Sequence, residues 1–321
     1  MNLPIKSTVI RNDPETGLRN RIRRPGQYRL IGPWRKAKKT AISGDTGFVG
    51  SHLQKLLQER GHEIVPIGRE LFVPEQRERL SEALSSCDTV INLAGAPLNR
   101  RWTAEYRREI YDSRIGTTRA IVEAIRSQEA KPNLFISASA VGYYPAKGCY
   151  GESDARKGEG FLADVCRNRE AEAIRVPPQV RCVIARFALI LAPDGGIFHR
   201  IAFPARHRIA VRLGSGQQHF AWIDLRDLMR AVEFVIQRPD ISGPVNMAAP
   251  RRINNGPFTR ALAERYRSWL VLPVPDLLLH LFMGEAAQLV LSGQCVYPEK
   301  LLAHGFTFLS DKIGDFLAQV E

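Results

Sequence analysis

The sequence predicts an α/β protein of the Rossmann type, a doubly wound parallel sheet with a smaller C-terminal substrate lobe. Short apolar runs alternate with segments of helical periodicity from Lys39 onward, the pattern of parallel strands joined by crossover helices. Three glycines, Gly44, Gly47 and Gly50, follow the first apolar run and open the first helical segment, as in dinucleotide-binding folds.

The individual elements follow from this alternation. Strands are expected at residues 40–43, 63–67, 89–93, 134–137 and 180–187, and helices at 49–60, 74–86, 104–126 and 160–175. Gly61 stands where a left-handed residue ends a helix. Beyond residue 187 the pattern loosens, and further helices are expected near 227–237, 258–267 and 277–291.

Composition excludes several classes of protein. With 44% hydrophobic and 25% charged residues among 321, the chain is neither disordered nor fibrous in character. The longest apolar stretch, 270–283, is interrupted by prolines and charge, and is shorter than the ~20 residues of a membrane span. Five scattered cysteines without a Cys-x-x-Cys pair predict no metal site and a reducing, cytoplasmic compartment.

The net charge of +13 is concentrated at the N-terminus. Residues 1–39 hold eleven Lys or Arg against two acids, so the other residues carry only +4. The basic extension, residues 1–38, could contact a protein partner, an acidic surface, nucleic acid or anionic lipid. A solvated extension is the simpler interpretation, and nucleic-acid binding, which would depend entirely on this arm, is not favoured.

The glycine turn has the composition of a phosphate-binding loop. One glycine serves a tight turn, one leaves room for a pyrophosphate, and one allows close packing of helix on strand. Glycine-rich turns also occur without a ligand, but the position between a first strand and its helix favours a nucleotide. The loop residues expected to contact it are Gly44, Thr46, Gly47, Phe48, Val49 and Gly50.

The tip of the second strand favours NADP(H) over NAD(H). Gly68 and Arg69 stand ~20 residues after the glycine turn, where NAD-binding folds carry an acid for the ribose hydroxyls. A guanidinium there pairs instead with the 2′-phosphate of NADP. Glu70 and Asp45 argue the other way, because a carboxylate repels a phosphate, and a solvated strand end would also account for Arg69.

The third strand runs out through Leu93, Ala94 and Gly95, at the edge where doubly wound folds bind their ligands. Ala94 and Gly95 fit a cofactor wall, whereas core packing explains Leu93 equally well. We therefore divide the chain into a basic extension (1–38), an NADP-binding Rossmann domain (39–190) and a mixed substrate lobe with a C-terminal helical segment (191–321), from which strands return to the main sheet.

Three motifs together resemble the extended short-chain dehydrogenase/reductase superfamily. They are the glycine turn, the run from Asn92 to Gly95, and the run from Ser137 to Tyr144. More narrowly, the chain resembles the YfcH-like branch, also called SulA-like or epimerase-family proteins, which carries a C-terminal segment of unassigned function. The branch-specific matches include Arg101-Trp102-Thr103, Asp112-Ser113-Arg114, Gly214-Ser215-Gly216-Gln217, Leu272-Pro273-Val274-Pro275, Gly284-Glu285 and Leu291-Ser292-Gly293-Gln294.

The resemblance covers residues 39–321 and implies a set of cofactor contacts. Besides the glycine turn, these are Gly68, Arg69, Leu93, Ala94, Glu109, Arg114 and Ile190. Glu109 and Arg114 stand five residues apart, so they do not form an i,i+4 ion pair. Arg114 could reach a phosphate or ribose, or form a surface ion pair with another residue.

The superfamily usually moves a hydride with a Ser or Thr and a Tyr-x-x-x-Lys pair, whose lysine lowers the pKa of the tyrosine. Residues 160–175 contain neither Tyr nor Lys. Ser139 matches the catalytic hydroxyl, and Tyr143 or Tyr144 could supply a phenol. Neither tyrosine has an obvious cationic neighbour in the sequence, and the lining of a substrate pocket is the alternative role.

Other reactive groups are less favoured. Cys166 could be a nucleophile, but no linked histidine is evident, and an inert buried thiol is the better interpretation. Residues 214–217 and Trp222 are expected in a loop that faces the nicotinamide. Asp224 stands where the branch usually has His, and His219 is either a substitute or simply solvated.

The sequence therefore predicts an NADP(H)-binding oxidoreductase or epimerase that acts on an unidentified small substrate. A sugar nucleotide is suggested by family analogy alone. The alternative is a catalytically reduced NADPH-binding regulatory or assembly subunit that uses its basic arm to contact a partner. The absence of Tyr-x-x-x-Lys favours this alternative.

Overall fold

The computed structural model describes residues 11–12, 19–20, 38–193 and 195–320. The chain divides into two compact units, residues 1–36 and 37–321. In the first unit, β1 (Arg11–Asn12) pairs antiparallel with β2 (Arg19–Asn20). Most of the basic extension predicted as a partner-binding arm lies outside the described residues.

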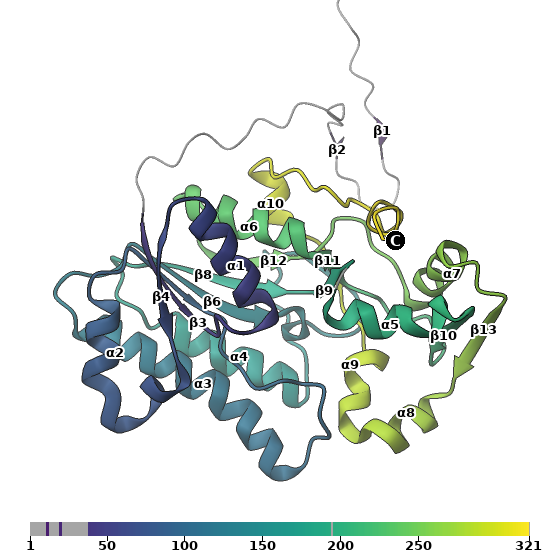
Figure 1. The fold of residues 1–321 in the computed structure, drawn as a ribbon, viewed down its shortest axis with the longest axis horizontal. Helices are drawn as coiled ribbons and strands as arrows, with labels where there is room; N and C mark the ends of the chain where they lie inside the picture. Colours follow the sequence, from purple (N-terminus) through teal and green to yellow (C-terminus); the bar gives the residue numbers. More distant parts are fainter. Residues whose placement is uncertain (1–10, 13–18, 21–37, 194, 321) are drawn as a thin grey trace, which may run out of the picture. The chain divides into compact units, whose positions relative to one another are not determined.

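A parallel sheet of six strands forms the centre of the second unit (Figure 1). Its strands are β3 (Lys39–Ser43), β4 (Glu63–Ile67), β5 (Thr89–Asn92), β6 (Leu134–Ala140), β8 (Arg181–Phe187) and β12 (Gly243–Met247). Their order is β12-β8-β6-β5-β3-β4, so the direction of winding reverses between β3 and β5. The doubly wound Rossmann-type fold is confirmed, and this reversal is where such folds bind ligands.

Helices cover both faces of the sheet (Figure 1). One face carries α1 (Phe48–Glu59) and α6 (Leu225–Gln237), and the other carries α2 (Arg77–Leu84), α3 (Ala104–Ser127) and α4 (Phe161–Ala173). The central strands are apolar runs because both their faces are buried; Ala41, Ile42, Val90 and Ile91 are at most 1% exposed. Gly61, at φ 82°, follows α1 as expected.

The chain after β8 contains helices and three short parallel strand pairs. β9 (Leu189–Ala192) pairs with β11 (Trp222–Asp224), β10 (Ile209–Leu213) with β13 (Leu270–Val274), and β14 (Cys295–Val296) with β7 (Cys149–Tyr150), which follows β6. The helices are α5 (Gly196–Arg206), α7 (Asn255–Arg265), α8 (Asp276–Met283), α9 (Gln288–Leu291), α10 (Glu299–Ala303) and α11 (Ile313–Leu317). Among the described residues, no helix has the length and apolar character needed to cross a membrane.

Several predicted boundaries differ from the observed ones. The helix expected at 277–291 is wrong as a single element, because Gly284, at φ 59°, ends α8 and a 3-10 turn, η4 (Gly284–Ala287), precedes α9. The helix expected at 74–86 begins as another 3-10 turn, η2 (Pro74–Gln76). Proline favours the first turn of a helix, since it has no N–H to donate.

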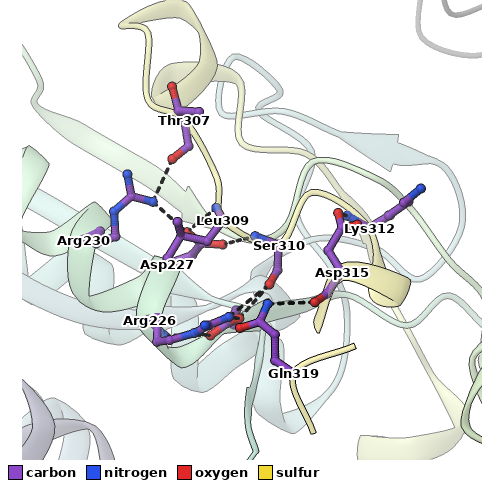
Figure 2. Close-up of polar contacts among 10 residues, drawn as sticks. Arg226, Asp227, Arg230, Thr307, Leu309, Ser310, Lys312, Asp315 and Gln319 are labelled. Atoms are coloured by element: carbon purple, nitrogen blue, oxygen red, sulfur yellow. Dashed lines mark hydrogen bonds and ion pairs between the residues drawn. The ribbon is translucent and has the colours of Figure 1, made fainter. Parts of the chain in front are cut away.

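Two buried carboxylates attach the C-terminal segment to α6 (Figure 2). The carboxylate of Asp227 accepts hydrogen bonds from the backbone N–H groups of Leu309 and Ser310, both at 2.8 Å. Arg230 donates to this carboxylate at 3.0 Å and to the carbonyl of Thr307 at 2.8 Å. Asp224, which caps the N-terminus of α6, accepts from the hydroxyl of Ser310 at 2.7 Å.

We predict that Asp227→Ala destabilises the protein by about 3 kcal/mol, because it leaves two backbone N–H groups buried without an acceptor. The measurement is urea unfolding of the full chain. Asp240→Ala is the matched control, because Asp240 forms its ion pair with Arg238 at the surface and should leave the midpoint unchanged. Equal effects of the two substitutions would contradict the role of Asp227.

Candidate functional site

The glycine turn lies against the end of β5. Gly44 has φ 74°, and the N–H of Gly47 donates to its carbonyl at 3.1 Å. A Cβ atom on Gly44 would lie 3.0 Å from the backbone N of Ala94, and one on Gly50 would lie 2.1 Å from the carbonyl oxygen of Gly44. Only glycine allows these approaches, so the predicted turn is built from backbone in contact with backbone.

The first turn of α1 presents backbone N–H groups with no competing side chain. Its N-cap is Gly47, no side chain caps it, and it contains no acid. The unpaired N–H groups and the positive end of the helix dipole therefore remain available for an anion. Thr46, Gly47 and Phe48 are exposed and Val49 is half-buried beside them.

A buried asparagine fixes the wall opposite the turn. The side-chain oxygen of Asn92 accepts from the hydroxyl of Ser43 at 2.8 Å and from the N–H of Ala94 at 3.2 Å. Its amide nitrogen donates to Thr118 on α3 at 2.8 Å. Asn92 thereby joins β3, β5 and α3 and holds Leu93 and Ala94, both half-buried, against Gly44.

The chain just after β4 carries one basic and one acidic side chain, Arg69 and Glu70. Arg69 begins a 3-10 turn, η1 (Arg69–Phe72), its side chain is exposed, and it forms no ion pair with any described residue. The carboxylate of Glu70 turns back over Gly68, where an added Cβ would lie 2.1 Å from one of its oxygens. The guanidinium therefore extends from the strand tip while the carboxylate covers the neighbouring glycine.

The remaining predicted cofactor residues lie in different environments. Arg114 donates to the carbonyls of Ala96 at 2.9 Å and Ile110 at 3.3 Å, and its guanidinium packs against Gly95. The surface ion pair considered for Arg114 is therefore absent among the described residues. Glu109 is exposed on α3, and Ile190 is half-buried on β9, opposite Ile223.

A buried ion pair surrounds Ser139 at the end of β6. The Ser139 hydroxyl donates to Oε1 of Glu170 on α4 at 2.6 Å. Arg186 on β8 binds both oxygens of the same carboxylate, at 2.9 and 2.7 Å. Burial disfavours the charged form of Arg186, but its hydrogen bonds to Glu170 outweigh this effect and raise its pKa, so Arg186 stays charged.

Arg186 is also the cationic neighbour of both tyrosines, and the expectation that they have none is wrong. Its guanidinium lies 3.6 Å from the ring centre of Tyr143 and donates to the hydroxyl of Tyr144 at 2.7 Å. The sequence hid this contact because Arg186 comes from a strand more than 40 residues later.

The two tyrosines differ in access to ligands. Tyr144 is only 1% exposed, and burial raises its pKa although Arg186 acts in the opposite direction. Tyr143 is half-buried. Tyr143 is therefore the phenol that a ligand can reach, and Tyr144 is a neutral, internal hydrogen-bonding group.

Helix α4 brings Cys166, and neither tyrosine nor lysine, to Ser139. Burial raises the pKa of the Cys166 thiol, outweighing its hydrogen bonds with Ser139 and the backbone of Ala140. A buried neutral thiol is a poor nucleophile. The structure thus supports the inert interpretation of Cys166.

Arg169, one turn further along α4, has a buried guanidinium, and no motif in the sequence indicated it. It is 5% exposed, donates to the carbonyl of Asn92 at 3.1 Å, and its Nε has no hydrogen-bond partner among the described residues. Burial, with a further contribution from Arg114, lowers its pKa to about 9. The edge formed by β5 and α4 therefore carries positive charge without a carboxylate beside it.

Trp222, Asp224 and His219 of the C-terminal lobe lie in three different environments. Trp222 is wrong as a loop residue, because it lies on β11, is 1% exposed and packs against Phe316 at 5.9 Å between ring centres. Asp224 is fully buried as the cap of α6 and takes no part in the edge of the sheet. His219 lies beside two cysteine sulfurs.

Those cysteines form a disulfide that spacing could not reveal. Cys149 and Cys295 are bonded although 146 residues separate them. The scattered spacing of the cysteines, without a Cys-x-x-Cys pair, therefore did not indicate this bond. Neighbouring strands β7 and β14 place them directly opposite each other in the register.

A doubly wound sheet with a glycine turn at its switch point defines the Rossmann class. Within that class, residues 40–248 match the NAD dependent epimerase/dehydratase family, and residues 274–320 match a domain of unknown function, DUF1731. The chain belongs to the NAD dependent epimerase/dehydratase family. This confirms the resemblance drawn from its motifs.

Relatives match along most of the chain. An epimerase family protein of Staphylococcus haemolyticus is 37% identical over 287 residues, covering 84% of this chain and 95% of the relative. A human epimerase family protein solved with NADPH is 27% identical, with a TM-score of 0.80, covering 88% and 98% of the two chains. A nucleoside-diphosphate sugar epimerase of Corynebacterium glutamicum is 27% identical, with a TM-score of 0.71, covering 88% and 58%.

We predict that Arg169→Met stabilises the nucleotide-free protein by about 1–4 kcal/mol, because it replaces a buried, uncompensated charge with an apolar side chain of similar volume. Chemical unfolding at pH 7 provides the measurement. The pKa of Arg169 is lower in the folded protein than in the unfolded chain, so the unfolded chain binds the proton more tightly. The charged Arg169 therefore lowers the free energy of unfolding by its full amount below pH 9, and this loss becomes smaller as the pH rises above 9.

The matched control is Arg186→Met, which removes the partner of buried Glu170 and should destabilise the protein. A loss of stability in Arg169→Met at pH 7 would show that the Arg169 charge is compensated in the folded protein.

Proposed function

We propose that this chain is an NADP(H)-dependent oxidoreductase or epimerase that acts on a small substrate of the sugar-nucleotide class. The observation that carries the proposal is the glycine turn at the switch point between β3 and β5. Any side chain on Gly44 or Gly50 would meet backbone atoms, and the helix that follows has an open, acid-free first turn. These features fit a pyrophosphate.

The residues of the turn and of the β4 tip would divide the recognition of the cofactor. The N–H groups of Thr46 and of residues 48–50 would hold the pyrophosphate, and Ala94 and Gly95 would form the wall beside it. Arg69 would bind the 2′-phosphate with its exposed guanidinium. The human relative solved with NADPH supports this choice of cofactor.

The chemistry would depend on Ser139 and Tyr143. A bound nicotinamide supplies or accepts a hydride at the substrate carbon. Tyr143 would exchange the proton at the substrate oxygen, because it is half-buried, where a ligand can reach it, and its ring packs on the guanidinium of Arg186. Ser139, oriented by its hydrogen bond to Glu170, would hold that oxygen in place.

Tyr144 would position these groups and would not transfer a proton. Its hydroxyl accepts from Arg186 and lies 3.1 Å from both the carbonyl of Gly151 and the side-chain oxygen of Asn246, to one of which it donates. These hydrogen bonds fix the guanidinium of Arg186 against the ring of Tyr143. Arg186 would then hold the ring of Tyr143 in position.

Two observations support a sugar nucleotide as the substrate class: the positive charge at the edge of the sheet and the function of a structural neighbour. Arg114 and Arg169 give the edge of the sheet a positive charge, which favours an anionic ligand such as a nucleoside diphosphate. The Corynebacterium glutamicum neighbour is a nucleoside-diphosphate sugar epimerase.

A regulatory NADPH-binding protein is the second candidate function. The observation that favours it is the composition of α4, which brings a neutral buried thiol to Ser139. Such a protein would bind the nucleotide with the same turn and would show no turnover.

We predict that calorimetry on the full chain detects NADPH binding, and that Arg69→Ala weakens it about 10-fold to 100-fold while leaving NADH binding unchanged. The reason is the loss of a charge-assisted contact with the 2′-phosphate. Gly50→Ala should weaken the binding of both nucleotides, and Gly116→Ala, whose added Cβ meets no atom within 4 Å, should weaken neither. The absence of heat with either nucleotide would refute the nucleotide site.

We further predict that the protein oxidises NADPH with at least one member of a panel of keto sugar nucleotides, and that Ser139→Ala reduces kcat by about 100-fold or more. Absorbance of the reduced nicotinamide follows the reaction. Cys166→Ala should retain activity, since its thiol is neutral and buried. Tight NADPH binding without turnover across the panel would favour the regulatory function.

A further inference from the structure

A second cluster of reactive side chains lies where β7 meets β14. It consists of Cys149, Cys295 and His219, whose ligand atoms all lie within 4.8 Å of one another. The two sulfurs form a disulfide, and the strands that carry them are parallel and in register. None of these residues takes part in the proposed nucleotide site.

His219 brings a ring nitrogen to this cluster. Its Nδ1 is buried and has no hydrogen-bond partner among the described residues, although buried ring nitrogens are normally paired. A cavity of about 10 Å³, lined by His219, Cys295 and Arg252 among others, adjoins the sulfurs. This is space for one water molecule or one ion.

We propose that Cys149, Cys295 and His219 form a binding site for a soft divalent cation such as Zn²⁺, which opens when the disulfide is reduced. Two thiolates and one imidazole are a common zinc ligand set that leaves a fourth position for water. The disulfide and the metal are then alternative crosslinks at one point, since both use the same two sulfurs.

The exchange between the two states is balanced with a dithiol as reductant. The dithiol gives two electrons and two protons to the disulfide, which becomes two thiols while the dithiol becomes its own disulfide. Binding of Zn²⁺ then displaces the two thiol protons to solvent and forms two metal–sulfur bonds. His219 contributes one ring nitrogen as a neutral ligand.

Arg252 has opposing effects on this site. Its guanidinium lies 3.2 Å from the sulfur of Cys149 and 3.9 Å from that of Cys295. A positive charge beside a sulfur favours the thiolate, which is the form that binds metal. The same charge repels a bound cation, but the Arg252 side chain is exposed and can turn toward solvent.

Either crosslink would join the two parts of the chain that match different families. Cys149 lies within residues 40–248, and Cys295 lies within residues 274–320. The next residue, Tyr150, stacks on Tyr144 with 5.4 Å between ring centres. The crosslink therefore holds the C-terminal segment against the framework that surrounds Arg186.

The test is a metal titration of the full chain in both redox states. The protein is reduced with a phosphine and freed of reductant and metal without oxygen. One sample is titrated with Zn²⁺, and a separate metal-free sample is titrated with Co²⁺ as a spectroscopic probe. Reduced protein should bind one equivalent of Zn²⁺ and give thiolate-to-cobalt charge-transfer absorption. Oxidised protein should give neither signal.

Matched variants separate this site from incidental thiols. His219→Ala and Cys149→Ser should each lower the Zn²⁺ affinity of the reduced protein by about 100-fold. Cys182→Ser should not change it. The cobalt spectrum of the unsubstituted chain reports the ligands even if a variant folds poorly. Absence of zinc from the reduced protein, unchanged affinity in His219→Ala, or equal loss in Cys182→Ser would each overturn the proposal.

Discussion

The contact between the glycine turn and the end of β5 is the constraint on which the candidate site depends. Two glycines leave no room for a Cβ atom, so the turn, the start of α1 and the exit of β5 form one backbone unit. The side chain of Asn92 fixes this unit through hydrogen bonds with Ser43, Ala94 and Thr118. Because the order of the sheet reverses between β3 and β5, this backbone unit stands at the position where doubly wound folds bind their ligands.

Charge along this edge is distributed unevenly. Arg186 is paired with Glu170 beside Ser139, whereas the hydrogen bonds of Arg114 and Arg169 to the described part of the chain go to backbone carbonyls. Uncompensated charges in a medium of low polarity are unfavourable without a counter-ion. The edge is therefore preorganised for an anion, and a bound phosphate would reduce the free-energy cost of folding this part of the chain.

The sequence was informative wherever structure is local. The sequence located the glycine turn and the strands β3, β4, β5, β6 and β8 correctly. Burial on both faces of a parallel sheet requires a run of consecutive apolar residues, and the sterics of a tight turn require glycine, so both features are visible in adjacent residues. Arg186 beside the tyrosines, the Cys149–Cys295 bond and the burial of Trp222 were missed. Each of these depends on strands that are distant in sequence, and one chain without pairing information does not reveal their register.

The C-terminal segment is part of the framework of the site and not an appended module. The side-chain oxygen of Asn246 contacts the Tyr144 hydroxyl at 3.1 Å, and its amide donates to the carbonyl of Tyr297 at 3.1 Å. Glu152 joins the same elements by accepting from the N–H groups of Asn246 and Lys300. Since Tyr144 holds Arg186, and Arg186 holds Glu170 and lies under Tyr143, displacement of this segment would alter the surroundings of Ser139 without touching the glycine turn. The glycine turn and the surroundings of Ser139 are thus supported by different parts of the chain.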